Sequence, residues 1–148
     1  MILVDSNVFL IALRYPRDVN AAINAQFLER MKVRKDGVTS IFNLLEILGI
    51  LSFNLNRTQL EALFQLFPDR FGIAVLPNAE VDSFLPKWTV GRLVERIARR
   101  LSLGDGMILE HAETPAFRIE TVVSWDASHF EGRTRLRLMT PTEFLAAG

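Results

Sequence analysis

Short apolar runs alternate with longer stretches of helical periodicity along this chain. The apolar runs at residues 1–4, 38–39, 73–76, 120–125 and 136–139 predict strands, because each is brief and lies beside turn-forming residues. Helices are predicted over residues 8–13, 19–35, 42–53, 58–67, 78–85, 90–101 and 104–112, with a last one after Thr140. Strands that alternate with helices predict an α/β fold with a mainly parallel sheet of four to five strands.

Capping residues mark several of the expected helix ends. Thr58 and Glu61 have the spacing of a capping box, and Pro68 is expected to end the helix that follows them. Residues 140–143 repeat the pattern, with proline at the first helical position.

Two acidic residues follow predicted strands. Asp5 comes directly after the first strand, and Asp126 comes directly after the run at residues 120–125. In open parallel sheets, ligands bind beyond the carboxyl ends of the strands, where the strand order reverses. Asp5 and Asp126 are therefore the first candidates for chemistry.

Glu46 interrupts an apolar helix. On a helix it shares a face with Phe42, Leu45, Ile50 and Phe53, so we expect a buried carboxylate. A lone buried carboxylate is unfavourable unless a cation, a hydrogen-bond network or a metal ion compensates it. The alternative is a glutamate at the rim of a helix that packs on several sides.

Other acidic residues have simpler interpretations beside the functional one. Asp5 is equally suited to cap the first helix, and Asp105 lies three residues after Ser102 in the spacing of a capping box. Asp126 also fits a turn. Both interpretations stay open for each residue.

Composition narrows the class of protein. At 148 residues we expect a single domain over residues 1–148, and 17 basic against 17 acidic residues argue against binding nucleic acid by bulk charge. The absence of cysteine excludes disulfides and thiolate zinc sites, and two histidines exclude a three-histidine metal site. No signal peptide or membrane span is recognised, so we expect a soluble cytoplasmic protein.

Four segments together resemble a known family. LVDSNVFL, NLLEILG, LSLGDGMIL and VVSWDASHF, in this order and at this chain length, resemble the PIN-domain nucleases and within them the VapC-like toxins of type II toxin–antitoxin pairs. The resemblance implies a PIN-like three-layer α/β/α sandwich. Gly106 and His111 depart from the small or apolar helix residues that are usual at their positions.

The resemblance also implies a site and its chemistry. The family's acidic positions match Asp5, Glu46, Asp105 and Asp126, which implies an endoribonuclease that depends on one or two Mg²⁺ or Mn²⁺ ions. Asp5 and Asp105 would bind metal directly, Glu46 directly or through water, and Asp126 directly or from outside the first layer of ligands. Supporting or substrate-contacting groups would be Ser6, Asn7 and Ser124. Expected partners are an RNA substrate, a small antitoxin protein and a second copy in a homodimer.

The remaining polar and aromatic residues have weaker assignments. Arginines cluster at positions 92, 96, 99 and 100 and again at 133, 135 and 137, either as solvated faces or as contacts to RNA phosphates or an acidic partner. His111, His129, Trp88 and Trp125 are expected to serve packing or turns. Two rival functions are a PIN-fold module that binds RNA or protein without cleavage and, more weakly, a phosphate-receiver domain with Asp5 in its acidic pocket.

Overall fold

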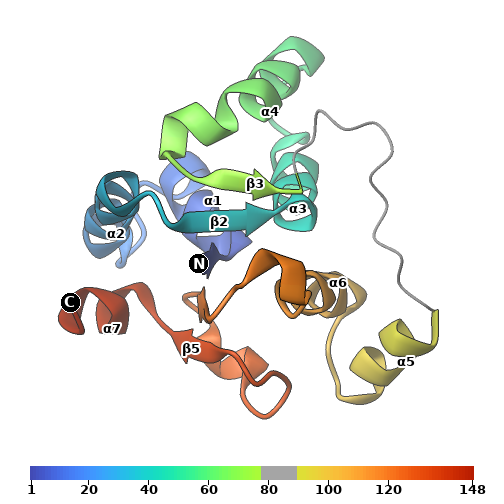
Figure 1. Cartoon of the computed structure of the whole chain (residues 1–148). Helices are drawn as coiled ribbons and strands as arrows, with labels where there is room; N and C mark the ends of the chain where they lie inside the picture. Colours follow the sequence, from blue (N-terminus) through green and yellow to red (C-terminus); the bar gives the residue numbers. More distant parts are fainter. Residues whose placement is uncertain (78–89) are drawn as a thin grey trace.

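A computed structural model describes residues 1–77 and 90–148 and contains a five-stranded, fully parallel sheet (Figure 1). The strands run in the order β3-β2-β1-β4-β5. They are β1 (Ile2–Val4), β2 (Gly37–Ser40), β3 (Ala74–Leu76), β4 (Thr121–Val123) and β5 (Arg137–Met139). The α/β class, the parallel sheet and its five strands are confirmed.

Helices cover both faces of this sheet. They are α1 (Ser6–Arg14), α2 (Ala21–Arg34), α3 (Ile41–Leu51), α4 (Arg57–Phe71), α5 (Val90–Ala98), α6 (Leu103–Ala112) and α7 (Pro141–Ala146). Two 3₁₀ turns, η1 (Pro115–Phe117) and η2 (Ala127–Phe130), flank β4. The described part of the chain contains no helix that is long and apolar enough to cross a membrane.

Alternation within the strands divides the core into two layers. Ile2 and Val4 of β1 pack with residues of α1, α2, α3 and α4, whereas Leu3 between them packs with Ile108 and Ala112 of α6. Successive side chains of a strand point to opposite faces, so a strand of three apolar residues is buried on both sides. The three-layer arrangement follows from this burial.

The strand order places a switch point between β1 and β4. From β1 the chain builds β2 and β3 on one side, and later adds β4 and β5 on the other. β4 lies parallel to β1 with Val4 opposite Val123, so the residues that follow these two strands meet at the same edge. This is the position where open α/β sheets bind ligands.

Both boundaries expected for the helix after residue 57 were wrong. The helix expected from residue 58 begins at Arg57, with Asn56 and Gln59 forming the capping box, and it continues through Pro68 to Phe71. Gly72 ends it in the left-handed conformation, with φ of 63°. The box at Thr140 and Glu143 is confirmed. The helix expected over 78–85 lies outside the described residues.

Phe67 offers a test of the larger core layer. Its side chain is fully buried and packs edge-on against Phe9, with ring centroids 4.9 Å apart. We expect Phe67→Ala to lower the free energy of unfolding by about 3–5 kcal/mol. Leu66→Ala, at a neighbouring position with 58% of its surface exposed, should change it by no more than about 1 kcal/mol. Urea denaturation measures both, and equal effects would contradict the core assignment.

Candidate active site

Asp5 occupies the turn between β1 and α1 and is almost fully buried. It is the N-cap of α1, and its Oδ1 accepts hydrogen bonds from the Ser6 amide at 2.8 Å and from Asn43 Nδ2 at 3.0 Å. Its Oδ2 accepts from Ser124 Oγ at 2.8 Å. The capping and functional interpretations of Asp5 are therefore compatible, because the carboxylate that begins the helix also lies at the sheet edge.

Asn43 was not identified from the sequence. It is fully buried one helical turn before Glu46, and its Nδ2 also donates to Ser6 Oγ at 2.9 Å. Ser6 Oγ in turn donates to Glu46 Oε2 at 2.5 Å. The available signal was the three-residue spacing of two polar positions in an otherwise apolar helix, which puts Asn43 and Glu46 on the same side.

The expected burial of Glu46 was wrong. Helix α3 buries Leu44, Ile47 and Leu51 against the core, while Glu46 is exposed. Leu45, on the supposed inner face, is 52% exposed. Apolar residues occur on nearly every side of this helix, so periodicity could not select the buried face. Glu46 reaches the sheet edge as a glutamate at the rim of the helix, the alternative recognised above.

Ser124, at the end of β4, organises the opposite side of Asp5. Its hydroxyl accepts hydrogen bonds from Asn7 Nδ2 at 2.9 Å and from the Asp126 amide at 3.0 Å, and donates its own hydrogen to Asp5. Asn7 Oδ1 accepts from the Trp125 amide at 3.1 Å. These contacts connect the first turn of α1 to the end of β4 and direct the chain toward Asp126.

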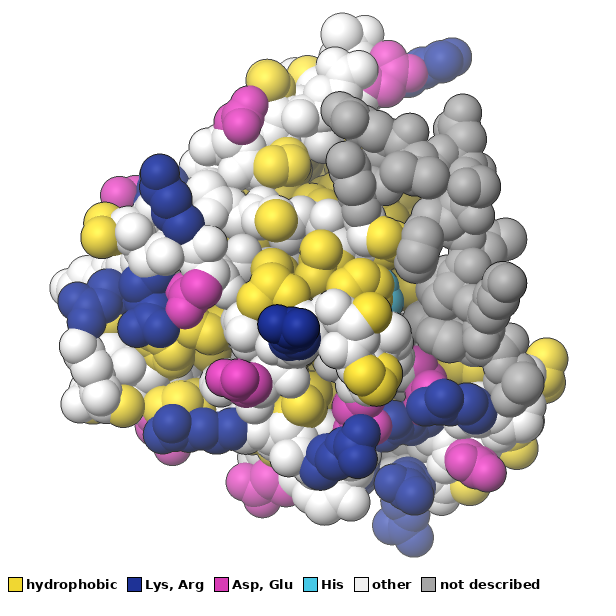
Figure 2. Space-filling model, viewed as in Figure 1, with side chains coloured by type: hydrophobic (Ala, Val, Ile, Leu, Met, Phe, Trp, Pro, Cys, Tyr) yellow, Lys and Arg dark blue, Asp and Glu magenta, His cyan; other side chains and the backbone are white. Residues whose placement is uncertain are grey.

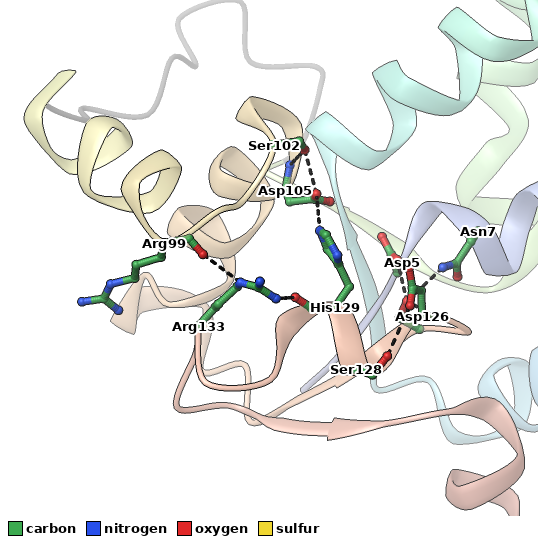
Figure 3. Close-up of polar contacts among 10 residues, drawn as sticks. Asp5, Asn7, Arg99, Ser102, Asp105, Asp126, Ser128, His129 and Arg133 are labelled. Carbon is green, nitrogen blue, oxygen red and sulfur yellow. Dashed lines mark hydrogen bonds and ion pairs between the residues drawn. The ribbon is translucent and has the colours of Figure 1, made fainter.

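Asp105 lies in the first turn of α6. Ser102 is the N-cap, and its Oγ accepts from the Asp105 amide at 3.0 Å and donates to Asp105 Oδ2 at 2.7 Å. The same Oδ2 lies 3.1 Å from His129 Nε2 (Figure 3). His129 was expected only to pack or to form a turn, and its position beside Asp105 was missed.

One cavity of about 210 Å³ collects these groups. It is lined by Asp5, Ser6, Asn7, Leu10, Glu46, Asp105, Asp126, His129 and Phe130. The four carboxylates come from four different parts of the chain: the turn after β1, helix α3, helix α6 and the start of η2. The structure thus brings together all four acidic residues that the resemblance selected.

Burial and neighbouring charge both act on Asp5. Burial raises the pKa of Asp5 from 3.8 to about 6, and the negative charges of Glu46 and Asp105 add to this effect. Hydrogen bonds from Ser124 and from the Ser6 amide act in the opposite direction. The buried carboxylate of the cavity is therefore Asp5, whereas Glu46, which was expected to be buried, is exposed.

The donor set suits a hard cation. Carboxylate oxygens are the ligands that Mg²⁺ and Mn²⁺ prefer, and a cation would offset the mutual repulsion that raises the Asp5 pKa. In residues 1–77 and 90–148, however, no three His, Cys, Asp or Glu side chains are grouped closely enough to hold one ion. Mg²⁺ usually keeps several of its own water ligands when a protein binds it. Carboxylates spaced around a cavity therefore suit Mg²⁺ better than they suit a cation whose ligands all come from the protein.

The arginines of α5 were expected to be solvated or to contact RNA phosphates or an acidic partner; Arg92 is exposed, Arg96 is buried, and both pair with glutamates. Arg96 is 6% exposed and pairs with Glu110 through Nε at 2.6 Å and with Glu113 through Nη2 at 2.5 Å. Arg92 pairs with the second oxygen of Glu110 at 2.7 Å. Helix α5 therefore packs on α6 through its charged side and leaves Val94 more than half exposed.

Arg133 also has a structural partner. Its Nε donates to the Arg99 carbonyl at 2.8 Å, and its Nη1 donates to the His129 carbonyl (Figure 3). The exposed arginines of the two clusters are Arg92, Arg99, Arg100, Arg135 and Arg137. Lys and Arg side chains gather toward the lower right of the face in Figure 2, where Figure 1 places α5.

The other histidine, His111, and one of the two tryptophans, Trp125, make structural contacts. His111 is buried, its Nδ1 lies 2.6 Å from Ser40 Oγ, and burial lowers its pKa from 6.5 to about 4. Trp125 Nε1 donates to Asn24 Oδ1 at 2.7 Å. Trp88 lies outside the described residues.

His111 and Asp5 predict opposite pH dependences of stability. Between pH 4 and 6.5 the unfolded chain protonates His111 and the folded chain does not, so this group stabilises the fold increasingly as pH rises. Between pH 3.8 and 6 the folded chain protonates Asp5 and the unfolded chain does not, so this group stabilises the fold less as pH rises.

We therefore expect the parent to gain stability relative to His111→Leu as pH rises from 4 to 6.5, by on the order of 3 kcal/mol. Relative to Asp5→Asn, the parent should lose stability as pH rises from 3.8 to 6. Urea titrations in EDTA at several pH values measure both differences. If the free energy of unfolding of a variant changes with pH in parallel with that of the parent, the pKa shift assigned to the substituted residue is contradicted.

Solved structures share this architecture. The chain matches the structure of FitAB bound to the IR36 DNA fragment with a TM-score of 0.60 and 18% identity, over 95% of each chain. It matches the crystal structure of VapBC2 from Rickettsia felis bound to a DNA fragment from their promoter with a TM-score of 0.61 and 19% identity, over 95% of this chain and 98% of that one. No protein-family model and no curated protein matches the sequence. At such low identity the likeness establishes the fold alone, and this fold agrees with the PIN-like α/β fold that the resemblance implies.

Proposed function

We propose that this chain is a metal-dependent endoribonuclease that acts as the toxin of a toxin–antitoxin pair. The observation that carries the proposal is the single cavity lined by Asp5, Glu46, Asp105 and Asp126 at the switch point of the sheet. The fold shared with the VapBC2 and FitAB complexes supports it. Net charge is zero, so we expect RNA selection to rest on local groups.

The chemistry of phosphodiester hydrolysis explains why acidic residues would gather here. Four carboxylates alone would repel a phosphate. Bound Mg²⁺ or Mn²⁺ supplies charge neutralisation and lowers the pKa of a water that can attack phosphorus. The chain's own contribution is to place carboxylate oxygens around the cavity and to keep them from turning away.

Each cavity residue has a role in this proposal. Asp5 and Asp105 would bind the ion directly, Glu46 directly or through water, and Asp126 directly or from outside the first layer of ligands. Asn43 and Ser6 orient Asp5 and Glu46 through their hydrogen bonds, and Ser124 and Asn7 orient Asp5 from the other side. Of the two roles expected for Ser6, Asn7 and Ser124, we propose the supporting one, because their side chains are hydrogen-bonded within the cavity wall.

The partners follow from the same assignment. The neighbours VapBC2 and FitAB are complexes bound to DNA. By likeness we propose that this chain binds a small antitoxin protein and forms a homodimer. Co-expression with the product of an adjacent small reading frame should relieve any growth arrest that the chain causes alone.

A PIN-fold module that binds RNA without cleaving it is the second candidate. It is favoured by the spacing of the acidic side chains, because the described residues include no group of three that already meets around one point. EDTA separates the two candidates: cleavage by the proposed nuclease stops when the divalent ion is removed, whereas binding by the module continues.

Asp105→Asn is the sharpest test of the nuclease. The amide keeps the shape of the side chain and can still accept from Ser102, but it is a poor ligand for a hard cation. We expect RNA cleavage in Mn²⁺ to fall by about 100-fold or more. Asp69→Asn, at an exposed position of α4, should cleave like the parent. Cleavage unchanged by both Asp105→Asn and EDTA would refute the mechanism.

Asp5→Asn is expected to combine two losses. Both oxygens of Asp5 accept hydrogen bonds, so an asparagine must point its NH₂ group at an existing donor. On the Ser124 side, that hydroxyl already accepts two hydrogen bonds and would have no acceptor for its own hydrogen. We therefore expect Asp5→Asn to cleave RNA more slowly than the parent. In EDTA at acidic pH it should also have a lower free energy of unfolding than the parent, because Asp5 of the folded parent is then protonated and removing its charge brings the smallest gain.

A further inference from the structure

His129 and Asp105 approach each other across the cavity, although they come from η2 and α6. Their contact joins Nε2 to Oδ2 at 3.1 Å. An ionised carboxylate only accepts hydrogen bonds, so the hydrogen in this contact belongs to Nε2 of the imidazole. His129 is thus a donor to one of the carboxylates that we assign to the ion.

The contact selects one oxygen of Asp105. Ser102 Oγ donates to Oδ2 at 2.7 Å, and His129 donates to the same atom. Among the described residues, both side-chain donors to the Asp105 carboxylate therefore bind the same oxygen, Oδ2. A carboxylate held at one oxygen by two donors from different elements cannot rotate freely, and its other oxygen remains for an ion or an ion-bound water.

His129 is itself held by its backbone. Its carbonyl accepts from Arg133, which also donates to the Arg99 carbonyl at the end of α5 (Figure 3). The Arg133 carbonyl accepts from the buried Arg96 at 3.0 Å. Arg133 therefore connects η2 to the segment that leads into Ser102 and Asp105. The donor, His129, and the acceptor, Asp105, are thus both held in place through Arg133.

A packing role explains these observations less well. The His129 side chain is 40% exposed, and its nitrogen is directed at a carboxylate, not into the core. Its neighbour Phe130 is buried and anchors the turn to the apolar core. Packing of the turn therefore depends on Phe130, and the polar atom of His129 is left for the cavity.

We propose that His129 is a positioning residue, whose Nε2–H fixes Asp105 for binding of the divalent ion. The proposal rests on the function proposed above and deepens it. Donors that orient a metal-binding side chain typically change metal affinity by about 10–100-fold when they are removed. The effect on this chain should therefore appear in metal binding itself, before any RNA is added.

The test compares two substitutions that differ in one hydrogen-bond donor. His129→Gln keeps an N–H near the position of Nε2, whereas His129→Leu keeps bulk and removes the donor. Mn²⁺ alone is the probe, and the free-ion signal in electron paramagnetic resonance measures its affinity. Glu131→Gln, at the exposed residue that ends η2, is the matched control for a change in the same turn. Thermal melts in EDTA show that each variant is folded.

We expect His129→Leu to bind Mn²⁺ about tenfold more weakly or worse, and His129→Gln and Glu131→Gln to stay within about threefold of the parent. Cleavage should follow the same order. Equal Mn²⁺ affinity in the parent and His129→Leu would overturn the proposal, as would equal losses in both His129 variants. Pulsed spectra of parent-bound Mn²⁺ that show a directly coordinated imidazole nitrogen would overturn it too, because His129 would then be a ligand.

The same measurements separate this proposal from the proposed function. A parent that binds no Mn²⁺ contradicts both. A parent that binds Mn²⁺ and cleaves RNA, with His129→Leu unchanged in affinity, contradicts only the role of His129. Loss of cleavage in His129→Leu at full Mn²⁺ affinity also contradicts that role, since it would place His129 on the substrate.

Discussion

The arrangement of the cavity depends on one buried carboxylate. Asp5 follows the central strand β1, and three donors from α1, α3 and the end of β4 converge on its two oxygens. A buried anion is tolerated only when hydrogen bonds or charges compensate it, so these elements cannot shift independently. The position of α3, and with it Glu46, is therefore tied to the same atom that ends the first strand. Burial raises the pKa of Asp5 to about 6 despite these hydrogen bonds, so they offset the cost of burying its charge only in part.

The second half of the cavity is attached by a different kind of interaction. Helix α6 contributes Ile108 and Ala112 to the core under the sheet, but its outer side carries Glu110 and Glu113, which hold Arg96 of α5. A buried ion pair is weak evidence for stability, since desolvation opposes the attraction, but removing one partner leaves an uncompensated charge. This network gives α5 and the Arg133 segment a defined place relative to α6. The ion pairs thus support the helix that carries Asp105, whereas Asp5, Glu46 and Asp126 are positioned by the main core and the hydrogen bonds at the ends of β1 and β4.

Sequence reasoning succeeded where a residue's position depends on its immediate neighbours. The strands were evident as short apolar runs, and Asp5 and Asp126 were placed because each follows such a run. It failed where the position depends on a distant partner. The apolar residues of α3 surround the helix, so its buried face is decided by packing against α1 and α4. Asn43 and His129 are ordinary polar residues until Asp5 and Asp105 are brought beside them. The inward side of α5 is charged because α6 presents glutamates, which periodicity within α5 does not reveal.

The division of the cavity between the two ends of the chain has a consequence during synthesis. Asp5 and Glu46 emerge from the ribosome early, but Ser124, which completes the hydrogen bonding of Asp5, belongs to a strand that must be inserted beside β1 after most of the chain has been made. Until then the sheet contains only β1, β2 and β3, and Asp126, which follows β4, has not yet been made. A protein of this topology cannot acquire a complete cavity while it is still being translated through its first hundred residues. Any antitoxin that recognises the assembled cavity would meet its target only after the nascent chain has reached β4.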